Sequence, residues 1–148
     1  MQDKQGKLTI QPPAWALKSL ANARIGHLAC STREGKPLDI PICFAFDGSA
    51  IYSSIDEKPK KARPLALRRV SNIIENPNVC LTVDKYAEDW RRLQYVLVIG
   101  RASITEQGKT FPEAITLLRK KYKQYNSMRL ETRPLITINP LRIIAWKS

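Results

Sequence analysis

Histidine and cysteine are both scarce in this chain of 148 residues, which contains one His and three Cys. Cys30, Cys43 and Cys80 are widely spaced and form no C-x-x-C pair, and His27 alone cannot complete a zinc ligand set. Each cysteine stands in an apolar, strand-like segment, which is typical of a reduced and buried thiol. The sequence therefore excludes a structural zinc site and a disulfide framework.

Long apolar segments are missing as well. No uncharged run approaches the about 20 residues that a membrane-spanning helix needs, and residues 1–7 lack the apolar core of a signal peptide. The composition, with 43% hydrophobic and 26% charged residues, is that of an ordinary globular protein. We expect a single domain over residues 1–148, in a soluble cytoplasmic protein with no membrane partner.

Motifs for side-chain catalysis are also absent. The chain has no G-x-G-x-x-G loop, no P-loop, no Ser-His-Asp order and no paired-carboxylate motif. His27 lies in an apolar segment between Gly26 and Leu28, which indicates a structural role for this side chain. The sequence thus names no catalytic side chain, and redox chemistry is expected only from a bound cofactor.

Acidic residues are few: 13 Asp and Glu face 25 Lys and Arg, which gives a net charge of +12. This excess indicates an anionic partner, either nucleic acid, anionic lipid or a phosphorylated small molecule. Two segments concentrate the charge, residues 58–74 with no acidic residue and the cluster 119–123. Residues 58–74 contain no aromatic side chain on which bases stack, which disfavours nucleic acid.

The hydropathy pattern predicts a mainly β protein with a few helices. Period-2 alternation at Ile40, Ile42, Phe44 and Phe46 is typical of a strand, and Asp47-Gly48 is a hairpin signal. Strands are expected over residues 24–32, 39–46, 50–55, 79–84, 93–105 and 135–146. Helices are expected over about 12–23, in the basic segment up to residue 75, and over about 111–124. Such sequential strands favour a small antiparallel barrel.

Several short segments, taken in order, resemble a known family. They are Leu28–Ser31, Gly35–Pro37, Ile40–Phe44, Asn72–Pro77 and Ile138–Pro140. This series is similar to the split-barrel flavin-binding proteins of the pyridoxamine 5'-phosphate oxidase-like family. The resemblance implies a six-stranded antiparallel split β-barrel of the FMN-binding type, flanked by helices. It also implies a homodimer that binds two flavin-type cofactors across the subunit interface.

Within that family, the chain most resembles the subgroup labelled deazaflavin-dependent oxidoreductases. The residues that carry this likeness are Lys58–Lys61, Asp84–Trp90 and Tyr95–Ala102. The founding enzyme ends in an Arg- and Pro-containing segment that helps to hold its substrate. Here the chain ends Arg142–Ser148 without it, so the resemblance does not imply oxidation of pyridoxamine phosphate.

A set of cofactor-binding residues follows from the resemblance and from the chemistry of a flavin. The resemblance implies that the backbone of Pro41, Ile42, Cys43 and Phe44 lies along the isoalloxazine ring. The phosphate needs converging cations and hydroxyl donors. The candidates are Ser53, Ser54, Lys58, Lys60, Lys61 and Arg69. Trp90 covers the cofactor or the dimer partner, or else packs on its own barrel.

The sequence therefore favours an oxidoreductase that uses FMN, or a deazaflavin, to transfer hydride to or from an unknown small molecule. The alternative is a protein that binds or stores flavin or haem without turnover. A nucleic-acid-binding barrel is a third class, which the missing aromatics disfavour. The colour of the purified protein separates these classes, because flavin, haem and nucleic acid absorb at different wavelengths.

Overall fold

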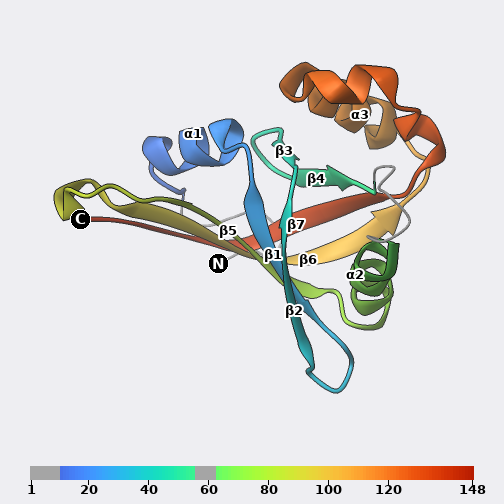
Figure 1. The fold of residues 1–148 in the computed structure, drawn as a ribbon, viewed down its shortest axis with the longest axis horizontal. Helices are drawn as coiled ribbons and strands as arrows, with labels where there is room; N and C mark the ends of the chain where they lie inside the picture. Colours follow the sequence, from blue (N-terminus) through green and yellow to red (C-terminus); the bar gives the residue numbers. More distant parts are fainter. Residues whose placement is uncertain (1–10, 56–62) are drawn as a thin grey trace.

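One antiparallel sheet organises the molecule. The computed structural model describes residues 11–55 and 63–148, and of residues 63–67 it describes the backbone alone. The strands run in the order β2-β1-β5-β6-β7-β4-β3 across the sheet (Figure 1). They are β1 (Gly26–Ser31), β2 (Pro37–Ile42), β3 (Ala45–Phe46), β4 (Ile51–Ser54), β5 (Asn78–Lys85), β6 (Gln94–Thr105) and β7 (Leu135–Lys147).

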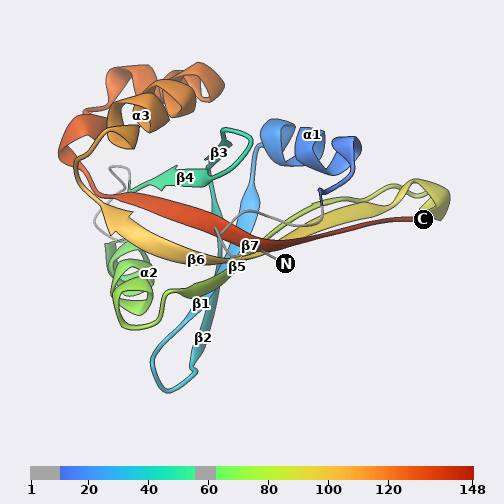
Figure 2. The ribbon, with the colours of Figure 1, turned by 180° about the vertical axis from the view of Figure 1, so that it is seen from behind.

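The helices flank this curled sheet. They are α1 (Ala14–Asn22), α2 (Arg63–Glu75) and α3 (Thr110–Lys121), with short 3-10 turns η2 (Trp90–Arg92), η3 (Lys123–Ser127) and η4 (Leu130–Thr132). Both ribbon views place α1 and α3 on the same side of the sheet, while α2 packs against β1 and β6 (Figures 1 and 2). The result is a half-barrel that matches the expected split barrel. None of the helices in the described ranges is long and apolar enough to cross a membrane.

The strand count is seven, whereas the sequence predicted six. The difference lies in the expected strand 39–46, which the structure divides into β2 and β3. At the break, the Phe44 amide donates to the Tyr122 hydroxyl (3.1 Å), and the Phe44 carbonyl accepts from the Lys121 ammonium (2.8 Å). A residue whose backbone groups bond to side chains cannot continue a ladder, so the strand ends and begins again.

Two apolar clusters stabilise the fold. The larger one lies on the inner face of the sheet around Leu28, Phe44 and Leu81, all fully buried. The smaller one lies under α3, where Phe111, Ile115, Leu118 and Tyr122 are buried with Leu135 of β7. The stripe that the sequence predicted for this helix is thus confirmed, because residues three or four apart share one face.

A bulge in the longest strand pair bends the sheet, as Gly100 had indicated. The pairing of β6 with β7 shifts register between Ile99 and Gly100. A Cβ atom built on Gly100 would lie 2.6 Å from the Asn139 carbonyl oxygen, which is closer than real contacts allow. Glycine at this position therefore permits the close approach of the two strands.

This contact generates a stability prediction. Gly100→Ala is expected to lower the free energy of unfolding by about 1–3 kcal/mol, because the added methyl group must push backbone apart. Ser103→Ala, at an exposed position of the same strand, is the matched control and should change stability by less than about 0.5 kcal/mol. Urea unfolding followed by circular dichroism measures both variants. Equal stability of Gly100→Ala and the wild type would show that the strands are not so closely packed there.

Candidate functional site

The segment expected to lie along a flavin ring is the end of β2 and the residue pair after it. Pro41 is exposed, Ile42 and Phe44 are buried, and Cys43 is half-buried. The side chains of Ile42 and Phe44 belong to the core, so only backbone atoms of this segment are available to a ligand. The Cys43 carbonyl already accepts a hydrogen bond of 2.8 Å from the Ser53 hydroxyl, which ties β4 to this segment.

Tyr122 joins three parts of the chain through a single hydroxyl. It accepts from the Phe44 amide (3.1 Å) and lies within hydrogen-bond distance of the Arg24 carbonyl (2.8 Å) and the Phe44 carbonyl (3.0 Å). The Arg24 guanidinium stacks on the Tyr122 ring at 4.6 Å and donates to the Lys121 carbonyl (2.7 Å). This network fixes the end of α3 against the start of β1 and the break after β2.

Lys121 is a half-buried cation with a strongly lowered pKa. Its ammonium group donates to the Phe44 carbonyl and lies 4.2 Å from the centre of the Phe44 ring. Burial and the neighbouring Arg24 charge lower the pKa of Lys121 to about 8, from an ordinary value of 10.5. Two like charges are therefore held close together at the end of α3.

Two buried polar side chains end strand β4. Ser53 and Ser54, the last residues of β4, are 2% and 3% exposed. The Ser54 hydroxyl is buried and has no hydrogen-bond partner among the residues that the structure describes. A buried hydroxyl without a partner costs about 1–3 kcal/mol, so this position suits a ligand that accepts or donates a hydrogen bond.

Arg69 is the cation that α2 directs into the protein. It is 3% exposed, whereas the adjacent Arg68 is exposed to solvent. Its charge acts on Cys30, whose thiol pKa is raised by burial and lowered by the Asn72 amide and by Arg69. Lys58, Lys60 and Lys61, the other predicted phosphate ligands, lie outside the described residues. Of the predicted phosphate cations, Arg69 is thus the one with a described place in the fold.

Trp90 lies far from these residues within its own chain. Its side chain is 67% exposed, in the loop at the tip of the arm that β5, β6 and the C-terminal end of β7 form. Figures 1 and 2 show this tip, next to the C-terminus, at the opposite end of the molecule from α2 and the end of β4. One chain alone therefore does not bring Trp90 together with Ser54 and Arg69.

His27 differs from its expected structural role. Its side chain is exposed, because β1 alternates and Leu28 takes the buried position. Each residue of a strand points to the face opposite its neighbour, so an apolar run does not by itself bury every member. His27 lies on the outer face of the sheet, opposite Pro41 of β2 and Thr82 of β5.

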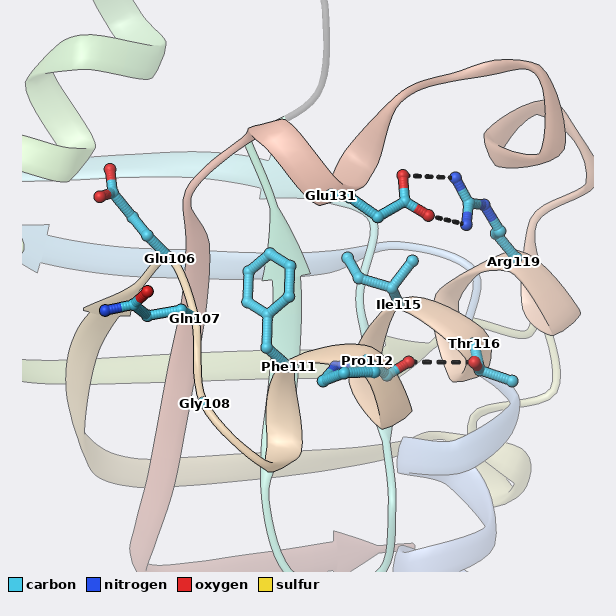
Figure 3. Close-up of a pocket in the computed structure, with 9 residues that line it drawn as sticks. All are labelled: Glu106, Gln107, Gly108, Phe111, Pro112, Ile115, Thr116, Arg119 and Glu131. Atoms are coloured by element: carbon cyan, nitrogen blue, oxygen red, sulfur yellow. Dashed lines mark hydrogen bonds and ion pairs between the residues drawn. The ribbon is translucent and has the colours of Figure 1, made fainter.

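A cavity of about 380 Å³ lies beside the first turns of α3. Figure 3 shows that Phe111 and Ile115 line it, with Glu106 on one side and the Arg119–Glu131 ion pair on the other. The Arg119 guanidinium holds the pKa of Glu131 well below its usual range. Because its cation is already neutralised, this cavity offers no unpaired positive charge to an anionic cofactor.

Comparison with protein families supports the fold and the sequence resemblance. The family model described as pyridoxamine 5'-phosphate oxidase matches residues 16–147. The chain belongs to this family. The comparison with curated proteins found no match.

Solved structures with the same fold include proteins with different ligands. An FAD-binding protein from Mesorhizobium loti is 20% identical, with a TM-score of 0.66 over 91% of this chain and 94% of that chain. An F420 reductase is 22% identical, with a TM-score of 0.60 over 90% and 98%. HutZ, the haem storage protein from Vibrio cholerae, is 15% identical, with a TM-score of 0.63 over 82% and 84%. At these identities the likeness concerns the fold.

The described residues fit the phosphate end of a flavin cofactor. The unpartnered Ser54 hydroxyl provides a donor, and Arg69 provides buried positive charge. Sequence reasoning missed Lys121 and Tyr122, which bond to the very segment expected to face the ring. The basic cluster 119–123 was visible in the sequence, but no local pattern showed that the end of α3 packs on Phe44.

The charge state of Lys121 generates a pH prediction. Between about pH 8 and pH 10.5, Lys121 is protonated in the unfolded chain and deprotonated in the folded chain. The contribution of Lys121 to the free energy of unfolding therefore rises with pH. The stability of the wild type minus that of Lys121→Met is therefore expected to increase across this window. Urea unfolding of both proteins, at several pH values, gives this difference. A difference that does not change, or that falls with pH, would contradict the lowered pKa.

Proposed function

We propose that this protein binds FMN, or a deazaflavin with the same ring, ribityl chain and phosphate, and acts as an oxidoreductase on a small molecule. The observation that carries the proposal is the burial of two polar side chains that the sequence predicted as phosphate ligands, Ser54 at the end of β4 and Arg69 on α2, in a chain of this family. The FAD-binding and F420-reductase neighbours support a flavin-type ligand in this fold. In this proposal the protein is cytoplasmic.

The phosphate of the cofactor binds beside β4 and α2. Its oxygens accept a hydrogen bond from the Ser54 hydroxyl, and the positive charge of Arg69 attracts the phosphate. The burial of both groups strengthens these interactions. Lys58, Lys60 and Lys61 stay predicted phosphate ligands from the sequence alone, because they lie outside the described residues.

The ring lies along the residues that follow β2. The Phe44 amide and carbonyl are engaged by Tyr122 and Lys121, and the Cys43 carbonyl accepts from Ser53, so the ring contacts come from the other backbone groups of this segment. The bound ring supplies the hydride chemistry. The protein binds and orients the cofactor, keeps water from the ring, and needs no side-chain acid of its own.

A second candidate function is haem binding without turnover. The haem storage protein HutZ shares the fold, and His27 is an exposed imidazole on the sheet of this chain. The two candidates differ in colour, because haem gives a Soret band and flavin absorbs in the blue. If His27→Gln and the wild type give the same spectrum after haem is added, His27 is not a haem ligand, and the second candidate is removed.

The cofactor site generates a binding prediction with a matched control. Arg69→Gln is expected to weaken FMN binding by about 10–100-fold, since a charge-assisted hydrogen bond contributes about 1.5–3 kcal/mol. Arg68→Gln removes the same charge from the exposed neighbouring position and should change affinity by less than about threefold. Ser54→Ala, which removes a hydroxyl without a described partner, should keep the fold and still lose affinity. Fluorescence titration with FMN, and in parallel with F420, measures these dissociation constants.

Three outcomes decide the proposal. Equal loss of affinity in the Arg68 and Arg69 variants would assign the effect to net charge and remove the buried site. Unchanged affinity in Ser54→Ala would move the phosphate elsewhere. Turnover requires a further measurement, in which the reduced cofactor on the protein is mixed with electron acceptors. A protein that binds FMN but never accelerates its oxidation or reduction is a carrier.

We further propose that the protein is a homodimer. The half-buried side chains of Ala29, Cys80, Ile99 and Leu141 line a hollow of about 380 Å³ on the outer face of the sheet. The arm adds Tyr86, Trp90, Tyr95 and Trp146, which are 39–67% exposed. Because Trp90 does not reach the polar pair of its own chain, it covers the cofactor of the second copy.

The dimer generates its own prediction. Sedimentation velocity at micromolar concentration is expected to show a species of twice the 16.9 kDa chain mass. Trp146→Ala removes the ring that stacks on Tyr95, with 5.6 Å between the two ring centres, and should shift the equilibrium toward monomer. Ile74→Ala, at an exposed apolar position on α2, is the control and should leave the dimer intact. A wild-type species of single-chain mass would overturn the proposal.

A further inference from the structure

A concave basic surface lies at the C-terminal end of α3, apart from the polar pair of β4 and α2. This cavity has a volume of about 500 Å³. It is lined by Arg24, Lys120, Lys121, Tyr122, Lys123 and Gln124. We refer to it as the α3-end cavity. Four of its six lining residues are cations, and none is acidic.

No acidic residue in the described part of the chain neutralises the positive charge of this cavity. Within the described part of the chain, the ion pairs join Asp89 to Arg91 and Glu131 to Arg119, and none involves a cation of the cavity. Arg24 and Lys121 donate to the backbone carbonyls of Lys121 and Phe44, which are uncharged. The C-terminal end of α3 contributes only about half a negative charge. A surplus of positive charge therefore remains in the cavity.

Two of the cations are held in place before any ligand arrives. The Arg24 guanidinium is fixed between the Lys121 carbonyl and the Tyr122 ring. The Lys121 ammonium is fixed between the Phe44 carbonyl and the Phe44 ring. Because these long side chains are already ordered, a ligand loses less conformational entropy in binding them. Such ordering distinguishes the cavity from a flexible basic surface.

Like charges held together favour a ligand of opposite sign. The Arg24 charge is one cause of the lowered pKa of Lys121, so the two cations repel each other in the free protein. An anion between them relieves that repulsion and favours the protonated lysine. The cavity is also larger than a single inorganic ion requires, and Gln124 adds a neutral hydrogen-bonding group at its wall.

We propose that the α3-end cavity binds a small polyanion, an organic molecule with two or more phosphate or carboxylate charges. Arg24 and Lys121 hold one anionic group, and Lys120 and Lys123 at the rim hold the second. The proposal does not rest on the flavin proposal, because the two sets of residues share no member. The basic residues gather in one hollow, which favours a compact molecule over an extended nucleic-acid strand.

Calorimetric titration of the full-length protein tests this site, with pyrophosphate and citrate as separate probes. Arg24→Gln is expected to weaken binding of both probes by about 10-fold or more. Lys109→Gln removes one charge at the opposite end of the same helix, and should change affinity by less than about threefold. Affinity should also fall as pH rises through about 8, where Lys121 loses its proton. Circular dichroism and thermal melting check that both variants are folded.

Other results would overturn the proposal. Absence of binding by both probes removes the site, and equal loss in the Arg24 and Lys109 variants assigns binding to net charge. Loss of binding in Arg69→Gln but not in Arg24→Gln would place the anion in the proposed cofactor site. A single-stranded oligonucleotide that binds more tightly than both probes, with the same dependence on Arg24, would identify a nucleic-acid surface.

Discussion

The hydroxyl of Tyr122 is the contact on which the arrangement of this protein depends. It forms hydrogen bonds with the amide and the carbonyl of Phe44 and with the Arg24 carbonyl. One atom therefore joins the end of α3, the start of β1 and the break after β2. The ring of the same residue supports the Arg24 guanidinium. Because a buried backbone amide needs a partner, this one side chain explains why β2 stops where it does.

From that contact the two candidate sites diverge. On one side, the interrupted strand leaves Cys43 beside β4, whose Ser53 and Ser54 are buried, as is Arg69 on α2. On the other side, the end of α3 gathers cations that no described carboxylate neutralises. Family membership supports a ligand at the first site, and the second stands on its charge and geometry alone.

Much of the fold follows from sequence patterns, and the exceptions have physical causes. Apolar, β-rich runs located the long strands, Gly100 located the bulge, and Phe111, Ile115 and Leu118 located the buried face of α3. The break at Phe44 was not predictable, because its cause is a tyrosine 78 residues away. The sequence also selected Arg69 as a phosphate ligand. That Arg69 is buried while Arg68 is exposed could not be predicted, because it depends on how α2 packs against the sheet. His27 was misjudged because one face of an apolar strand can still meet solvent.

The position of β7 in the sheet determines when the protein can fold during synthesis. β7 is the C-terminal strand, yet it lies between β6 and β4, and β3 reaches the sheet only through β4. A nascent chain still short of Leu135 therefore leaves the β3–β4 hairpin unattached and one edge of β6 open. Open edges pair readily with other chains. Until β7 has emerged from the ribosome, this edge of β6 is therefore open to pairing with other chains.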